Sequence, residues 1–230
     1  MVELLTVLAI ISLITAVAAP SFTSVSSGYN LTNSTNTLAG ALQRARTYAM
    51  AHNTYVWVGL YEENADAAAP TVVPPPYTGQ GRIVLGMAAS LDGTQIYADS
   101  ASAATLPAAR IAPIDKLIRL QNVHLSQIVA PSSTTEGSTL LTTRPVSNYS
   151  IYSSSAQTTP YPMVIGQYTF YNTIRFSPSG EVSINGSTTP QHIGEIGLQP
   201  THGDTLEQTP PNLAAIQFTG IGGNVQVYRN

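Results

Sequence analysis

The first twenty residues limit what this chain can fold into more than any other part of the sequence. Residues 4–19 are apolar or small, with only three hydroxyl-bearing interruptions, and a single carboxylate, Glu3, precedes them. Pro20 follows the run, and the first cation of the chain is Arg44. The run is close to the ~20 residues needed to cross the hydrocarbon core of a bilayer. Such a segment needs a membrane, other subunits or a protein core around it.

Three simple interpretations of this segment compete. A cleaved signal peptide fits the length and the small residues before Pro20, but it would carry a basic start rather than Glu3. A plain membrane anchor also leaves Glu3 unexplained, because a carboxylate beside hydrocarbon is costly. A buried core helix is the third interpretation. Proline removes one helical hydrogen bond and clashes with the preceding turn, so we expect a kink near Pro20.

Helical spacing continues beyond Pro20 as the composition becomes polar. Apolar residues recur at intervals of seven, four, three and four, which is typical of one face of an amphipathic helix. These residues are Leu31, Leu38, Leu42, Ala45 and Ala49. Residues 26–28 and 30–37 are Ser, Gly, Asn and Thr for the most part and favour bending or a local break. A helix over residues 1–53 would be ~80 Å long, so one end must protrude from a domain of this size.

After residue 54 the pattern changes to short strands separated by long loops rich in Pro, Ser and Thr. Two hairpins are expected, one turning at Pro178, Ser179 and Gly180 and the other between Gly220 and Gly223. The expected strands cover residues 55–61, 82–87, 117–125, 163–170, 173–177, 181–184, 192–198, 213–218 and 224–229. The predicted fold class is therefore α+β. It consists of a long N-terminal helix, kinked or partly melted after Pro20, packed on a C-terminal antiparallel β-rich domain.

Composition excludes several classes of function. Only 9% of residues are charged and the net charge is −3, so the chain has no basic footprint for nucleic acid. The absence of cysteine excludes disulfides and thiolate sites. The four histidines show no metal-ligand spacing, and no nucleophile elbow is present, so we expect no metal, no cofactor and no catalytic residues. Glu62, Glu63 and Asp66 are interpreted as a solvated acidic turn rather than as a calcium site.

The combination of Glu3, an apolar helix and Pro20 resembles the N-terminus of type IV pilins and of type II secretion pseudopilins, in which Glu precedes Pro by seventeen residues, as it does here. Members of that family carry two more residues before the position of Met1. Two further regions are similar to the H-type minor pseudopilins and to verrucomicrobial cassette pilins. They are Leu38, Ala41, Leu42, Ala45, Arg46 and Ala49 before a strand, and residues 174–182 with residues 222–229 near the C-terminus.

The resemblance implies an assembly helix over residues 1–53 and a β-rich head over residues 54–230. It implies a structural subunit of an extracellular type IV pilin-like filament, not an enzyme, whose partners are its own copies, the inner membrane before assembly and the assembly machinery. A minor pseudopilin and a membrane-anchored adhesin or binding module remain alternatives. The implied assembly residues are Glu3, Met1, Leu4, Leu5, Leu8, Ile11, Leu13 and Pro20. In this scheme Glu3 neutralises the terminal ammonium of a neighbouring copy.

Overall fold

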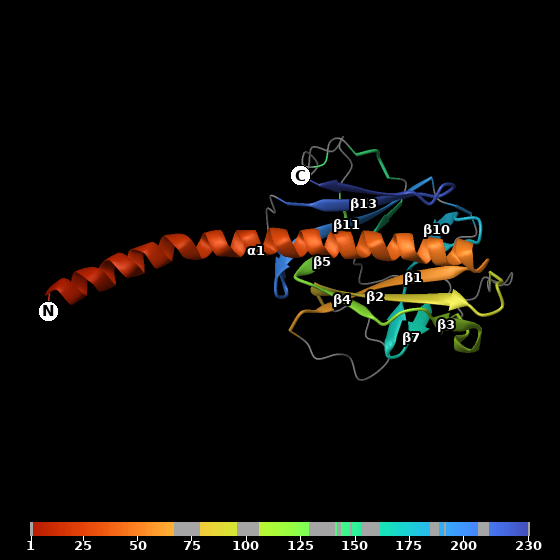
Figure 1. Ribbon diagram of the computed structural model, residues 1–230, viewed down its shortest axis with the longest axis horizontal. Helices are drawn as coiled ribbons and strands as arrows, with labels where there is room; N and C mark the ends of the chain where they lie inside the picture. Colours follow the sequence, from red (N-terminus) through yellow and green to blue (C-terminus); the bar gives the residue numbers. More distant parts are fainter. Residues whose placement is uncertain are drawn as a thin grey trace.

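The described residues form one long α-helix and a β-rich head, and the helix extends far beyond the head (Figure 1). The computed structural model describes residues 2–66, 79–95, 106–128, 141, 144–147, 149–152, 162–184, 189–190, 192–206 and 212–229. Along the helix, side chains are described for residues 3–15 and from residue 28 onward.

Helix α1 spans Val2–Ala51 without a break in its secondary structure. Its second half lies across the head and its first half projects into solvent, with the N-terminus at the far tip (Figure 1). The amphipathic face predicted from spacing is confirmed, since Leu38, Leu42, Ala45 and Ala49 have no exposed surface and Leu31 is 4% exposed. Burial of this face is what fixes the second half of α1 on the head.

The predicted fold class requires correction. The helix does not melt after Pro20, and it curves gently along its first half (Figure 1). Nor is it packed on the domain along its length, because residues 3–15 are exposed, and Leu31 is the first buried residue among the helix positions whose side chains are described. Most of the regular structure described outside α1 is antiparallel β-sheet.

Tertiary contacts explain why the polar stretch stays helical. Thr35 is buried, and its hydroxyl donates a hydrogen bond to the Leu31 carbonyl at 2.6 Å, so the buried hydroxyl has a partner within the helix. Arg229 donates to the Thr32 carbonyl at 3.4 Å and to Asn36 Oδ1 at 2.7 Å. Asn, Ser and Thr each make a helix less stable than Ala does, by at most ~0.7 kcal/mol per residue. These bonds and the burial of the neighbouring leucines outweigh that cost.

The first of the two large sheets lies under α1 and is centred on the long strands β1 (Val56–Asn64) and β2 (Gly81–Ser90), which pair antiparallel. Its strand order is β10-β9-β1-β2-β3, and β4 also pairs with β2. The outer strands are β3 (Ile111–Pro113), β4 (Ile118–Gln121), β9 (Asn172–Phe176) and β10 (Val182–Ile184). A short 3-10 helix, η1 (Ala108–Arg110), leads into β3.

The second large sheet is built around β11 (Ile193–His202), with the order β12-β11-β13-β14. Strands β5 and β6 also pair with β11, and the β6 pairing is parallel. Its other members are β5 (Val123–Ser126), β6 (Tyr149–Ile151), β12 (Thr205–Leu206), β13 (Ala214–Thr219) and β14 (Val225–Arg229). A separate two-stranded sheet joins β7 (Met163–Ile165) to β8 (Tyr168–Phe170).

Strands β1 and β2 are buried almost throughout because both faces of their sheet are covered. Alternate residues such as Val58 and Leu85 face the main core beneath α1, and the intervening ones, such as Trp57, join a second core that includes Phe170. A Cβ atom at Gly59 would lie 2.5 Å from Phe170, so glycine is required there for the ring to approach the strand.

The packing of α1 on the head gives a direct test. Replacing fully buried Leu42 with Ala should lower the free energy of unfolding by about 2–5 kcal/mol, because it removes a core side chain and leaves a cavity. Gly40→Ala on the same helix is the matched control. A Cβ at Gly40 meets no atom within 4 Å, so this variant should gain about 0.5–1 kcal/mol of stability. Urea unfolding in detergent, followed by the fluorescence of Trp57, measures both; equal effects would contradict the packing described.

Candidate assembly surface

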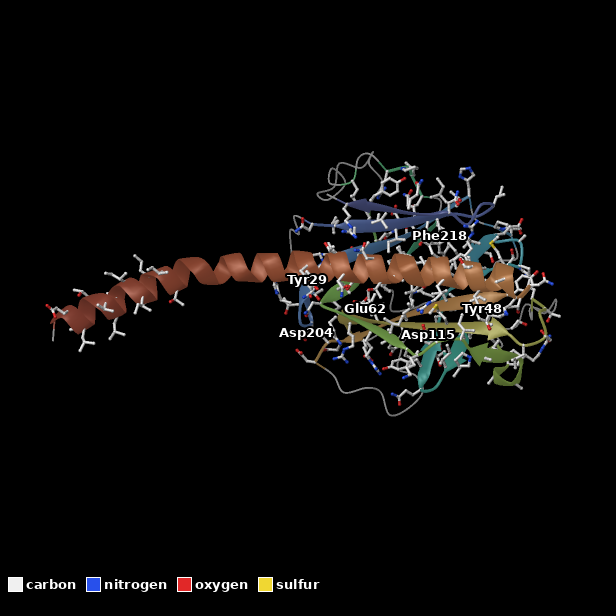
Figure 2. All side chains as sticks on the ribbon, in the orientation of Figure 1. Tyr29, Tyr48, Glu62, Asp115, Asp204 and Phe218 are labelled. Carbon is white, nitrogen blue, oxygen red and sulfur yellow. The ribbon has the colours of Figure 1, made fainter. Side chains whose placement is uncertain are left out.

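Residues 3–15 of α1 form an apolar surface against which no other described part of the chain is packed. Eight large apolar side chains between residues 4 and 14 each keep between 52% and 70% of their surface exposed. They are Leu4, Leu5, Val7, Leu8, Ile10, Ile11, Leu13 and Ile14, and they project on all sides of the helix (Figure 2). A helix that is apolar all round belongs in a buried setting.

The size of this exposed surface argues for a partner. Burying one such side chain is worth about 1.5–3 kcal/mol, so the eight represent on the order of 10–20 kcal/mol. That is comparable with the ~5–15 kcal/mol by which a whole domain is stable. Exposed apolar patches of this extent mark interaction surfaces.

The polar side chains in this segment do not need water. The hydroxyl of Thr6 donates to the Glu3 carbonyl at 2.9 Å, Ser12 donates to Ala9 at 2.9 Å, and Thr15 donates to Ile11 at 2.7 Å. Each hydroxyl is therefore satisfied by the preceding turn of its own helix. This arrangement suits surroundings that offer no hydrogen-bonding solvent.

Glu3 lies in the first turn of α1, where the helix dipole favours a negative charge. Its carboxylate takes part in no ion pair within the described part of the chain, and the residue is exposed. Leu4, Leu5, Leu8, Ile11 and Leu13 are exposed beside it as described above. Met1 lies outside the described residues, and Pro20 lies within the helix at a position whose side chain is also outside them.

Among the residues that the structure describes, no helix is both long and apolar enough to span a membrane.

Acidic residues of the head that were predicted to be solvated are in fact buried. Glu62 is fully buried on β1 and Glu63 is 6% exposed, so the expected solvated turn is wrong for both, while Asp66 is exposed. Within the described residues no cluster of three or more metal-ligating side chains is found.

The partner of Glu62 comes from the other large sheet. His124 Nδ1 on β5 lies 2.7 Å from Glu62 Oε1, and the Leu125 amide donates to Oε2 at 3.3 Å. This pair joins β1 to β5 and fastens the two large sheets together. Sequence reasoning missed it because 62 residues separate the two side chains and neither sits in a motif.

A second buried charge cluster holds the region after β5 against the second sheet. Arg144 Nε lies 3.3 Å from Glu195 Oε2, and Gln217 donates to the same oxygen at 2.7 Å. Arg144 also donates to the Ile128 carbonyl at 3.1 Å. Burial raises the pKa of the Glu195 carboxyl, while the hydrogen bond from Gln217 and the charge of Arg144 oppose that rise. Both clusters join segments of the head that are distant in the sequence through buried or nearly buried charged groups.

Comparison with known protein families, characterised proteins and solved structures gives no match for this chain.

The Arg144–Glu195 pair makes stability depend on pH in a way that can be measured. Since the pKa of Glu195 is raised above its ordinary 4.5, its contribution to stability is complete below that value and is lost as the pH rises through the folded-state pKa. Arg144→Met removes the cation that opposes the rise in the pKa of Glu195, so the variant loses more stability as the pH increases. We expect the variant to lose about 3–5 kcal/mol of unfolding free energy at pH 7 and clearly less at pH 4.5.

The double variant Arg144→Met with Glu195→Gln is the control, because it no longer carries the buried carboxyl of Glu195. Its unfolding free energy should show a flatter pH dependence than that of the single variant. Equal losses for Arg144→Met at both pH values would contradict the assignment.

Proposed function

We propose that this chain is a structural subunit of an extracellular type IV pilin-like filament, which assembles by packing the first half of α1 against the same segment of other copies. One observation carries the proposal. Eight large apolar side chains surround a helix that no other part of the described chain covers. Identical helices offer each other an equally apolar surface, so self-assembly buries all of it.

Glu3 supplies the register in this proposal. In the apolar interior of a filament an unpaired carboxylate is expensive, and a neighbouring cation lowers that cost. The terminal ammonium of an adjacent copy is the cation proposed to pair with it. If one helix were shifted along its axis relative to its neighbour, the Glu3 carboxylate and the ammonium would both be unpaired. The pairing therefore selects one axial offset between copies.

The remaining parts of the chain suit this role. Before assembly, the apolar segment would hold the precursor in the cytoplasmic membrane, from which the assembly machinery would take it. After assembly, the β-rich head would form the outside of the filament. A surface rich in Ser, Thr and Asn, with only 9% charged residues overall, fits an exported protein. Counting copies in native filaments would separate a major subunit from a minor one.

Two exposed leucines allow a matched test of the assembly surface. Leu8 on α1 is 61% exposed and Leu91 on the head is 64% exposed. Leu8→Asp places a charge among the packed helices and should abolish filaments, because the centre of the apolar segment then carries a buried unpaired carboxylate. Leu91→Asp should assemble normally. Negative-stain electron microscopy of sheared cells counts filaments, and equal counts for the two variants would exclude the proposed surface.

Glu3 gives a second test. Glu3→Gln keeps the shape of the side chain and removes its charge, so assembly should fall to background if pairing sets the register. Folding of the head should be unaffected, because the carboxylate makes no ion pair in the described structure. The thermal midpoint in detergent is the control for folding. A variant that produces wild-type amounts of filament would refute the role given to Glu3.

A further inference from the structure

A pocket of about 450 Å³ lies where the second half of α1 meets the β13–β14 hairpin. The helix contributes Gln43, Arg46 and Thr47, and the hairpin contributes Gly223, Asn224 and Gln226. The projecting first half of α1 is the stalk. The pocket lies near the end of the head that is farther from the stalk, because its helical residues immediately precede Tyr48, which lies at that end (Figure 2).

Arg46 stands in this pocket without a counter-charge. Its Nε atom is buried and has no hydrogen-bond partner, and its guanidinium makes no ion pair within the described residues. The side chain rests against the tips of two hairpins. A Cβ at Gly180 would lie 3.3 Å from Nε and one at Gly223 would lie 2.7 Å from it, and both glycines have positive φ. Two turns thus leave room for the cation and hold it in place.

The other groups around the pocket are neutral, and their hydrogen-bond donors remain available. Tyr228 donates to Gln226 Oε1 at 2.7 Å, which leaves the amide NH₂ of Gln226 as a donor. The amides of Gln43 and Asn224 also line the pocket, and no carboxylate does. A fixed cation surrounded by amide donors in a concave site suits an anion, and the planar fork of a guanidinium matches a carboxylate.

An exposed acidic turn offers the complementary charge at the opposite end of the head. Asp66 and Asp204 are both exposed, and Asp66 Oδ2 lies 3.6 Å from the Cβ position of Gly203, the residue before Asp204. Asn64 Nδ2 donates to Asp204 Oδ2 at 3.4 Å. Neither carboxylate forms an ion pair within the described part of the chain. Asp204 lies at the stalk side of the head near Tyr29, away from Tyr48 (Figure 2).

We propose that the Arg46 pocket of one copy binds the acidic turn of Asp66 and Asp204 on the next copy, head to tail. This inference rests on the filament function proposed above and adds a specific contact to it. Arg46 and Tyr29 are seventeen residues apart on α1, which places the two surfaces roughly 25 Å apart along the helix axis. A pairing between opposite ends of identical molecules is heterologous, so it repeats from copy to copy and need not close.

Charge reversal tests the contact. Arg46→Glu sets a carboxylate against two others and should lower filament yield at least about tenfold, equivalent to about 1.4 kcal/mol per contact. Adding Asp204→Lys to Arg46→Glu should restore most of the yield. Lys116→Glu reverses an exposed cation elsewhere on the head and is the matched control, with yield unchanged. Normal assembly of Arg46→Glu, or no rescue by the second change, would overturn the contact.

A second measurement examines the pocket without filaments. The full chain, dispersed in detergent, is titrated with sodium acetate while the ¹⁵N–¹H signal of the Arg46 Nε group is followed by NMR. A saturable shift of this signal supports a carboxylate site, and no shift overturns it. Acetate binding combined with normal assembly of Arg46→Glu would assign the pocket to a free carboxylate ligand and reject the next copy as its occupant. If the wild-type chain forms no filaments, the proposed function is refuted. The acetate titration then still decides whether the pocket binds a carboxylate.

Discussion

The burial of apolar surface governs both halves of α1, with opposite results. In the second half, leucines and alanines at helical spacing pack on two sheets and leave almost no exposed surface. Between residues 4 and 14, large apolar side chains keep more than half of their surface exposed. The free energy gained by burial is proportional to the apolar area removed from water. The second half of α1 has gained it on folding, whereas the exposed apolar side chains of the first half would gain it only on contact with a partner. The head therefore has a buried core of its own, whereas the apolar side chains of the stalk have no packing partner within the described residues.

Charged groups have a different task inside the head. Glu62 with His124 and Glu195 with Arg144 are removed from water and join elements distant in the sequence. Such pairs contribute little net stability over apolar substitutes, but breaking one leaves a costly lone charge. They therefore penalise alternative strand arrangements more than they strengthen the observed one. With so few charged residues in the chain, several of those present are used in this way.

Local patterns in the sequence predicted the parts of the fold that depend on neighbours. The spacing of Leu38 and Leu42 identified the buried helix face, and the turns at Gly180 and Gly223 confirmed both predicted hairpins. The predicted strand over residues 117–125 is instead two strands, because Asn122 adopts a φ of 57° between them. The continuity of α1 through its polar stretch, the pairing of β11 with β5 and β6, and the Arg46 pocket all depend on contacts between distant segments. Propensity and periodicity carry no information about those contacts. For residues 4–14, the assembly role stays a prediction from the sequence, and the structure adds that their large apolar side chains are exposed.

An unbroken α1 also has a mechanical consequence. With no flexible joint between stalk and head, a pull on the head passes along one column of backbone hydrogen bonds to the tip near Glu3. Proline has no N–H, so the column is one bond short at Pro20, and the helix should stretch there first under load.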